Sequence, residues 1–193
     1  LIQSEKLDYF LGTYGNGIYR INHQTKDTIQ FLKPKDSKRT VYNFFEMKDK
    51  TILAVTNNGF FEIKNDHYIF REILSGTNFS AASQAIDNSL YLGSSGKGLF
   101  IKKENQLHFQ QFKGFENAIL PENLIIQDLL VDKRNQLWIA TYGKGVYLVN
   151  FDKKTIQNFT EDKNNPYALH YNDVLSLFED NTGTIWLGIM MSI

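Results

Sequence analysis

The sequence contains no cysteine and only three prolines among its 193 residues. Without cysteine, disulfides, thiolate metal sites and cysteine nucleophiles are all excluded. No stretch approaches the roughly 18 consecutive apolar residues that a membrane-spanning helix needs. The first residues, LIQSEKLDYF, also lack the basic segment and apolar core of a secretory signal. We therefore expect no membrane segment within this chain.

A net charge is also missing, since 21 lysines and arginines balance 21 aspartates and glutamates. Nucleic acids and anionic membranes are bound through a basic face, so we expect no direct nucleic-acid binding. The four histidines show no HxH or HExxH spacing, and no phosphate-loop or nucleophile-elbow motif occurs. No metal, cofactor or catalytic residue is predicted.

Aromatic residues are abundant, with 15 Phe, 10 Tyr and 2 Trp. Such a composition, with few Ala/Leu/Glu/Lys tracts, favours strands over helices. The length suffices for one domain with a sizeable core. We expect residues 1–193 to form a single all-β domain.

One sequence pattern recurs along the chain. Its copies are LDYFLGTYGNGIYRI from Leu7, TILAVTNNGFFEI from Thr51, SLYLGSSGKGLFI from Ser89, QLWIATYGKGVYLV from Gln136 and the shorter TIWLGIMMSI from Thr184. The equivalent residues Thr13, Thr56, Ser94, Thr141 and Ile189 are 43, 38, 47 and 48 residues apart. A fixed period in this range is typical of repeat architectures such as propellers.

Each copy predicts the same run of strands. An apolar strand, a polar turn such as Asp180–Gly183 and a second apolar strand form a β-hairpin. Third strands follow at Ile18–Ile21, Phe60–Ile63, Leu99–Ile101 and Val146–Val149, and fourth segments at Thr28–Leu32, Tyr68–Ile73, Leu107–Phe112 and Thr155–Phe159. Four short strands per unit are characteristic of β-propeller blades. We expect repeats at roughly 1–40, 41–78, 79–125 and 126–173, with the start of a fifth at 174–193.

Two sets of repeat positions have predicted structural roles. Large apolar residues share the second-strand position and suit packing between neighbouring blades: Phe10, Leu53, Tyr91, Trp138 and Trp186. Glycines follow the second strand, as in Gly143-Lys144-Gly145, where a tight turn needs a positive φ. Asp132 and Asp180 occupy equivalent turn positions and are expected to cap backbone N–H groups.

The pattern V-x-x-L-x-E-D-x-x-G-x-I-W-[IL]-[GA]-T, followed by a glycine turn and G-[VIL]-[YF], resembles the two-component regulator propeller repeat. Val174–Gly188 matches best and Ile126–Tyr147 next. The resemblance implies a piece of the extracytoplasmic sensor part of a hybrid two-component system. Such sensors respond to oligosaccharides and relay the signal to a histidine kinase, which is not in this chain. On this basis we expect a non-catalytic, extracytoplasmic module that senses an oligosaccharide.

Two other function classes stay open. A propeller-fold polysaccharide lyase or glycosidase would need carboxylates, His or Tyr converging on one face. A purely structural scaffold for another protein would need no such cluster of side chains. About four repeats are also fewer than the roughly six to eight blades expected of a closed ring. We therefore expect a fragment, a truncated gene product or a subunit that completes its ring by association, and we expect self-association through an exposed blade face.

The predicted ligand contacts lie in two kinds of loop. The turns between second and third strands present Tyr14, Asn16, Asn58, Lys97, Tyr142 and Lys144. The long connection from Thr160 to Asn172 contributes Tyr167 and His170. Loops between blades usually carry a propeller's specificity because the sheets only position them.

Overall fold

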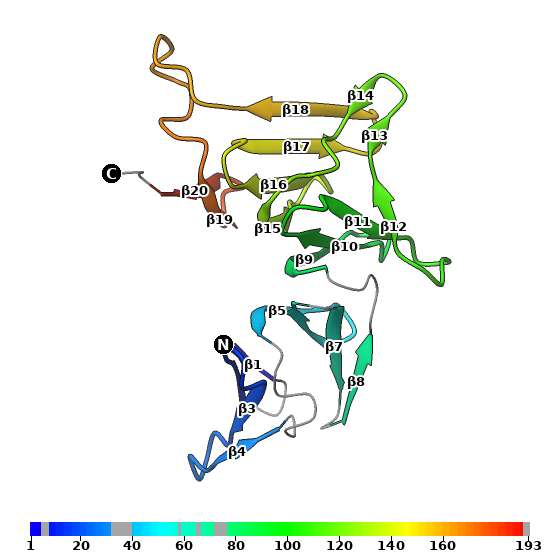
Figure 1. The fold of residues 1–193 in the computed structure, drawn as a ribbon, viewed down its shortest axis with the longest axis vertical. Helices are drawn as coiled ribbons and strands as arrows, with labels where there is room; N and C mark the ends of the chain where they lie inside the picture. The colour runs from blue at the N-terminus through cyan, green and yellow to red at the C-terminus, as the bar shows by residue number, and fades with distance from the viewer. Residues whose placement is uncertain (5–7, 32–39, 58, 65–66, 72–76, 191–193) are drawn as a thin grey trace. The chain divides into compact units, whose positions relative to one another are not determined.

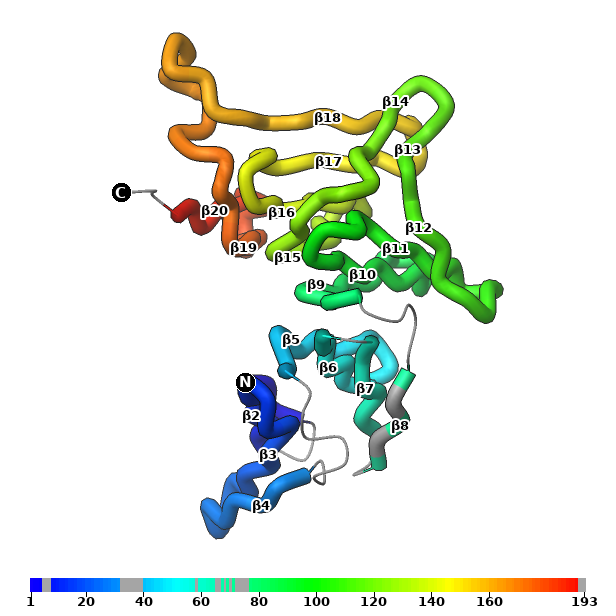
Figure 2. The backbone as a smooth tube through the Cα atoms, in the orientation of Figure 1, coloured from blue at the N-terminus to red at the C-terminus, as the bar shows by residue number. Residues whose placement is uncertain are grey.

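The computed structural model describes residues 1–4, 8–31, 40–57, 59–64, 67–71 and 77–190, so Asn58 lies outside the described residues. Within these ranges the chain is all-β, with antiparallel strands, no helix and no closed sheet (Figures 1 and 2). Membrane-spanning helices are accordingly not found in the described part of the chain. The predicted all-β fold of four-stranded blades is confirmed.

The described strands form four four-stranded sheets and two two-stranded sheets. The four larger sheets and the two-stranded sheet at the end of the chain are here called blades 1 to 5 (Figure 1). Blade 1 consists of β1 (Ile2–Gln3), β2 (Tyr9–Gly12), β3 (Ile18–Ile21) and β4 (Thr28–Gln30). Blade 2 consists of β5 (Val41–Glu46), β6 (Ile52–Thr56), β7 (Gly59–Lys64) and β8 (His67–Arg71).

Blade 3 consists of β9 (Phe79–Gln84), β10 (Leu90–Ser94), β11 (Leu99–Lys102) and β12 (Gln110–Phe112). A separate hairpin follows it, made of β13 (Gly114–Phe115) and β14 (Ala118–Ile119). Blade 4 consists of β15 (Ile126–Val131), β16 (Leu137–Thr141), β17 (Val146–Asn150) and β18 (Thr155–Phe159). Blade 5 has two described strands, β19 (Val174–Glu179) and β20 (Ile185–Ile189).

The chain divides into two compact units, Leu1–Ala82 and Ser83–Ile193, and the boundary falls inside β9. The first unit contains blades 1 and 2, and the second contains blades 4 and 5 with nearly all of blade 3. The organisation of residues 1–193 as a single domain stays a prediction.

The turn between the first and second strands has the same geometry in four blades. In blade 4 the Asp132 N–H donates to the Gln136 carbonyl, and the Asn135 N–H donates to the Asp132 carbonyl. The residue whose N–H makes the second of these bonds has a left-handed backbone in each turn: Lys50, Asn88, Asn135 and Gly183. Glycine and asparagine adopt this conformation at little cost, so the polar turns of the repeat follow from local chemistry.

The turn between the second and third strands is closed by a hydroxyl. In blade 4 the Thr141 N–H and Oγ1 both donate to the Gly145 carbonyl, the latter at 2.7 Å. Equivalent hydroxyl bonds to a glycine carbonyl come from Thr13, Thr56 and Ser94. The recurring Thr or Ser at this repeat position therefore satisfies a turn carbonyl within the blade.

The residue just before that hydroxyl lies under the next blade. In the first unit, a Cβ on Gly12 would come within 2.7 Å of the Val41 Cγ1, where blade 2 begins. In the second unit, a Cβ on Gly93 would come within 2.5 Å of the Ile126 Cγ2, where blade 4 begins. Ala140 packs against Val174 of blade 5 in the same way. Small residues are needed here because an apolar side chain of the following blade fills the space.

The predicted inter-blade position behaves differently in its five copies. Phe10, Leu53 and Tyr91 are buried, and Trp138 is half-buried against the cluster formed by Ala140, Val146 and Val174. Trp186 is the exception, with 59% of its surface exposed on the two-stranded blade 5. The prediction of an inter-blade contact is thus wrong for Trp186 within the described residues.

Side chains of the first strands of the blades also join neighbouring blades. The Ser83 Oγ of blade 3 accepts a hydrogen bond from the Val131 N–H of blade 4. The Asp128 Oδ2 of blade 4 accepts one of 2.9 Å from the Leu177 N–H of blade 5. Since strands of different blades share no ladder, these bonds satisfy backbone donors that would otherwise lack a partner.

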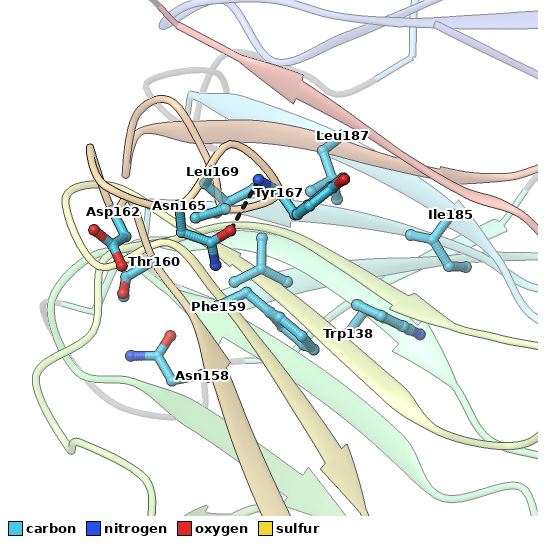
Figure 3. Close-up of a pocket in the computed structure, with 12 residues that line it drawn as sticks. Trp138, Asn158, Phe159, Thr160, Asp162, Asn165, Tyr167, Leu169, Ile185 and Leu187 are labelled. Atoms are coloured by element: carbon cyan, nitrogen blue, oxygen red, sulfur yellow. Dashed lines mark hydrogen bonds between the residues drawn. The ribbon is translucent and has the colours of Figure 1, made fainter.

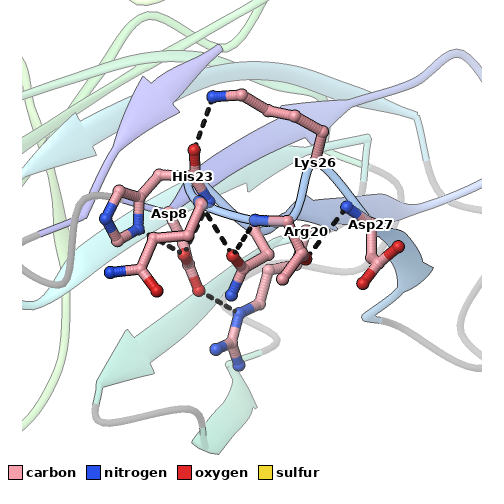
Figure 4. Close-up of polar contacts among 8 residues, drawn as sticks. Asp8, Arg20, His23, Lys26 and Asp27 are labelled. Atoms are coloured by element: carbon pink, nitrogen blue, oxygen red, sulfur yellow. Dashed lines mark hydrogen bonds and ion pairs between the residues drawn. The ribbon is translucent and has the colours of Figure 1, made fainter.

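A buried carboxylate organises blade 1 (Figure 4). Asp8 is 3% exposed, and its Oδ2 accepts a 2.7 Å hydrogen bond from the Arg20 Nε. Its Oδ1 accepts a hydrogen bond of 3.1 Å from the His23 N–H. Burial alone raises the pKa of Asp8, but the bonds from His23 and Arg20 outweigh it and hold the pKa below its usual value.

Candidate ligand site

A cavity of about 500 Å³ opens in the second unit where blade 4, blade 5 and the connection between them meet (Figure 3). We call it the loop cavity. It is lined by twelve residues: Trp138, Val146, Asn158, Phe159, Thr160, Asp162, Asn165, Tyr167, Ala168, Leu169, Ile185 and Leu187. Its volume lies within the roughly 300–1,000 Å³ typical of small-molecule sites.

The loop that borders the cavity is held in shape by its own hydrogen bonds. The Asp162 Oδ1 accepts from the Asn164 N–H at 2.9 Å, and the Asn165 Oδ1 accepts from the Tyr167 N–H at 3.0 Å. The Asn172 Oδ1 accepts from the Glu161 N–H at 2.8 Å and so ties the two ends of the loop together. Asn and Asp are suited to this because their short side chains bond to the backbone two residues on.

The apolar wall comes from four strands, β16, β17, β18 and β20. Trp138 of β16 and Phe159 at the end of β18 stack with ring centroids 5.9 Å apart and an interplanar angle of 17°. Ile185 and Leu187 of β20 face them across the cavity (Figure 3). Trp186, between these two, does not line it, as the two-residue period of a strand requires.

Two aromatic rings at the mouth remain open to solvent. Phe159 is 41% exposed and Tyr167 is 95% exposed. The polar groups beside them are the side chains of Asn158, Thr160, Asp162 and Asn165. Exposed ring faces next to amide, hydroxyl and carboxylate groups can bind a ligand that has both C–H faces and hydroxyls.

The structure brings few of the predicted contact residues into this cavity. Tyr167 lines it, whereas His170 of the same loop does not. Tyr142 and Lys144 are exposed on a turn that is fastened to the loop, because the Gly145 N–H donates to the Asn172 carbonyl at 2.9 Å. Lys97 is exposed on the equivalent turn of blade 3, and Tyr14 and Asn16 are exposed on that of blade 1.

Sequence reasoning missed several residues of the cavity. Asn158 and Phe159 were assigned only to a strand, and Thr160 only to the start of the long connection, yet all three line the cavity. Trp138 was assigned to the inter-blade core, and it serves both that core and the cavity. The available signal was position, since Phe159 is the last residue of β18 and directly precedes the long loop.

Comparison with known proteins identifies the repeat. A family model described as "Two component regulator propeller" matches residues 119–143. This segment runs from β14 through the hairpin of blade 4 to the turn at Tyr142 and Gly143. No curated protein sequence matches the chain.

Three solved structures have similar folds. One is described as the extracellular domain of a hybrid two component system from B. thetaiotaomicron, with a TM-score of 0.78 and 22% identity over 93% of this chain and 24% of that one. A second domain described in the same terms from that organism has a TM-score of 0.75 and 21% identity over 96% of this chain and 25% of that one. Virginiamycin B lyase from Staphylococcus aureus has a TM-score of 0.73 and 12% identity over 96% of this chain and 61% of that one.

The chain thus spans about a quarter of the length of the two sensor ectodomains it matches. At these identities the likeness establishes the fold, which an enzyme and two sensor ectodomains share. The family match shows, in addition to the fold, which repeat the sequence at residues 119–143 contains. The resemblance inferred from the recurring motif is confirmed: this chain is built of propeller blades and carries a two-component regulator propeller repeat at residues 119–143.

Proposed function

We propose that this chain is the ligand-sensing part of a two-component sensor and that it binds an oligosaccharide in the loop cavity. The observation that carries the proposal is the stacked pair Trp138 and Phe159, of which Phe159 is 41% exposed, beside Asn158, Asp162 and Asn165. A sugar ring has an apolar face of C–H groups and a rim of hydroxyls, and both find partners here.

The chemistry of the cavity supports binding without catalysis. Asp162 is the single carboxylate among the twelve lining residues, and none of the twelve is a histidine. A glycosidase generally needs two carboxyl groups on either side of the bond it cleaves, and a lyase needs a base beside a stabilised anion. A bound sugar in this cavity would therefore be held and released unchanged.

The sensing role is supported by the family match and the sensor ectodomains of the same fold. The proposed location is extracytoplasmic, where a sugar from outside the cell is met. Transmission to a histidine kinase would use parts of the sensor other than this chain. Binding can reach those parts only if ligand-bound and ligand-free states differ in shape or mobility.

The turn residues belong to the same proposal. Tyr142 and Lys144 lie on a turn bonded to the loop at Asn172, so a longer glycan leaving the cavity would pass them. Tyr14, Asn16, Asn58 and Lys97 stay proposed contacts on the equivalent turns of their own blades, and His170 on the loop. A cavity that holds one or two rings leaves the rest of an oligosaccharide for such outer contacts.

The two tryptophans make a direct test possible. Trp138 lines the cavity, whereas Trp186 does not. In Trp186→Phe the fluorescence reports Trp138 alone, and in Trp138→Phe it reports Trp186 alone. Titration with a panel of neutral oligosaccharides should change the emission of Trp186→Phe in a saturable way and leave Trp138→Phe nearly unchanged. The same ligand should raise the melting temperature of the wild-type chain.

Asp162→Ala combined with Asn165→Ala should weaken the response of Trp186→Phe by about tenfold or more, since each removes a polar contact. Glu161→Ala is the matched control, because Glu161 is an exposed loop residue outside the lining. No saturable change across the panel would contradict the oligosaccharide proposal. Shortened products in the same tubes would instead support the enzyme alternative.

We also propose that the chain self-associates through the exposed face of blade 5. Phe178 and Trp186 are paired across β19 and β20, and they are 62% and 59% exposed. Adjacent large apolar residues on a surface commonly mark an interaction site. Light scattering should detect dimers or larger species, and Phe178→Lys should shift them toward monomer. A monomer at all concentrations would contradict this.

A further inference from the structure

The connection from blade 3 to blade 4 carries an inserted hairpin, β13 and β14. Of the two blade-to-blade connections that the structure describes in full, 113–125 and 160–173, only the first contains such a hairpin. Its entry is tight, because Gly114 has a φ of 105° and a Cβ there would clash with the Ala118 carbonyl. The Leu120 N–H closes it on the Lys113 carbonyl at 3.0 Å, and the Leu120 side chain is fully buried.

The hairpin helps to enclose a second cavity of about 440 Å³ between blades 3 and 4, which we call the hairpin cavity. Its fourteen lining residues come from strands of blade 3, from the hairpin and from the turns at 132–136 and 151–154 of blade 4 and at 85–89 and 103–106 of blade 3. Both blades that form it have four strands. The two cavities use opposite ends of β18: Asn158 and Phe159 at its end line the loop cavity, and Phe151, Asp152 and Lys154 just before its start line the hairpin cavity.

The apolar part of the hairpin cavity is an aromatic cluster. Phe151 stacks on the buried Tyr91 with centroids 5.4 Å apart and an interplanar angle of 11°. Phe112 of β12 and Phe115 of the hairpin pack against Phe151 at 5.4 and 5.9 Å. The three phenylalanines are only half-buried, so ring surface remains open to an occupant.

The polar part combines balanced charges with amides. Asp87 and Asp152 carry two negative charges, and Lys103 and Lys154 carry two positive charges. No ion pair joins any of these four side chains within the described residues. The side chains of Gln106, Gln110, Gln111 and Asn135 complete the lining. A charged ligand gains little here, because it meets equal numbers of attractive and repulsive groups. A wholly apolar ligand is also disfavoured, because it would displace the water bound to the polar groups without replacing its hydrogen bonds.

We propose that the hairpin cavity is a second binding site, for a single neutral polyhydroxylated ring such as a monosaccharide unit. The C–H face of the ring packs on Phe112, Phe115 and Phe151. Its hydroxyls bond to the carboxylates, ammonium groups and amides of the lining. This site is separate from the loop cavity and does not depend on a ligand being bound there.

The experiment uses the ¹⁵N-labelled full chain and the methyl glycosides of glucose, galactose, mannose and xylose as probes. At least one glycoside should shift the amide signals of residues 101–112 and 151–154 in a saturable way. Sorbitol, an open-chain polyol without a ring, and glucuronate, a charged ring, should bind at least about tenfold more weakly. Absence of saturable shifts at these residues with all four glycosides would overturn the proposal.

Asp152→Ala combined with Gln110→Ala should weaken these shifts by about tenfold or more, and both side chains are exposed enough to be replaced without loss of fold. Asp162→Ala, in the loop cavity, is the matched control and should leave them unchanged. If the double variant proves unstable, Gln106→Trp, which fills the cavity mouth, should abolish the shifts in a folded protein. Shifts that persist in the folded variants would overturn the assignment. If the fluorescence of Trp138 does not respond to oligosaccharides but the glycoside shifts are seen, the loop-cavity proposal is contradicted and the hairpin-cavity proposal is supported.

Discussion

The indole Nε1 of Trp138 donates a 2.9 Å hydrogen bond to the Oδ2 of Asp132, six residues before it. Trp186 and Asp180 are joined in the same way at 2.8 Å. In each hairpin the other carboxylate oxygen accepts backbone N–H groups of the turn, those of Arg134 and Gln136 for Asp132. The repeat's Asp and Trp are therefore one structural unit, in which the turn and the second strand are fixed by the same side chain.

Replacing Asp132 by alanine should destabilise the second unit by about 1–3 kcal/mol, because three donors lose their acceptor in a place that is 7% exposed to water. Urea denaturation followed by tryptophan fluorescence measures this. Asp180→Ala removes the equivalent bonds in blade 5, where water can reach the donors, and should have a smaller effect. Equal losses would show that burial does not decide the cost.

The hydroxyl of Thr141 should also contribute measurably. Thr141→Val keeps the shape of the side chain but removes the 2.7 Å bond to the Gly145 carbonyl, and Thr141 is fully buried. We expect a loss of about 1 kcal/mol in urea denaturation, since the carbonyl keeps its bond from the Thr141 N–H. Thr141→Ser retains the hydroxyl and should lose distinctly less. A serine variant as unstable as the valine variant would argue for methyl packing instead.

The two glycines of that turn should differ in their tolerance of alanine. Gly143 and Gly145 have φ values of 75° and 69°, so alanine is strained at both by about 1 kcal/mol. A Cβ at Gly145 also clashes with the Phe159 carbonyl, whereas at Gly143 its nearest neighbour is the Asp173 Oδ1 at 3.9 Å. Thermal unfolding should show the larger loss for Gly145→Ala. Because Phe159 lines the loop cavity, this variant should also weaken ligand binding.

Acid should weaken the first unit through Asp8. Its pKa is lower in the folded chain than the roughly 3.9 of an unfolded aspartate, so its stabilising effect is complete above that value. The effect is lost as the pH falls from about 4 through the folded pKa. Urea titrations followed by the amide signals of residues 8–31 should show this loss. Asp8→Asn should be less stable at neutral pH and lose less on acidification, whereas exposed Asp27→Asn should follow the wild type.

Asp128 should give the second unit the opposite dependence. Burial raises its pKa, and the bonds from the Leu177 and Leu129 N–H groups offset this only in part. The folded carboxyl therefore takes up a proton at a higher pH than the unfolded one, and stability rises as the pH falls through the folded pKa toward about 3.9. Tryptophan fluorescence reports this unit, which contains both tryptophans. Asp128→Asn should flatten the profile, and an unchanged profile would exclude Asp128 as its source.

The blades could be predicted from sequence because each strand repeats a local pattern. The third strand at Ile18–Ile21 and the fourth at Thr155–Phe159 have the predicted bounds. The turns were also predictable, since glycine and asparagine at positive φ are a local requirement. The bond between Asp132 and Trp138 was not predicted, although its fixed spacing of six residues recurs at Asp180 and Trp186 and could have revealed it.

The cavities depend on contacts that no local pattern encodes. Trp138, Phe159 and Leu187 come from three strands, and only the packing of blade 4 with blade 5 brings them together. The hairpin at Gly114–Ile119 does not show as extra length, because Ser94 and Thr141 are 47 residues apart while Thr141 and Ile189, whose connection has no such hairpin, are 48 apart. The exposure of Trp186 likewise depends on its surroundings and not on its repeat position.

Every blade with a described turn between its first two strands closes that turn with the same pair of backbone hydrogen bonds. The residues that shape this turn therefore lie within the sequence segment that encodes the blade. A duplicated stretch would yield a blade that already folds its turn and needs only a small residue where the next blade presses on it. Recombination can thus lengthen or shorten such a protein in whole blades, while the connecting loops that border the two cavities can diverge separately.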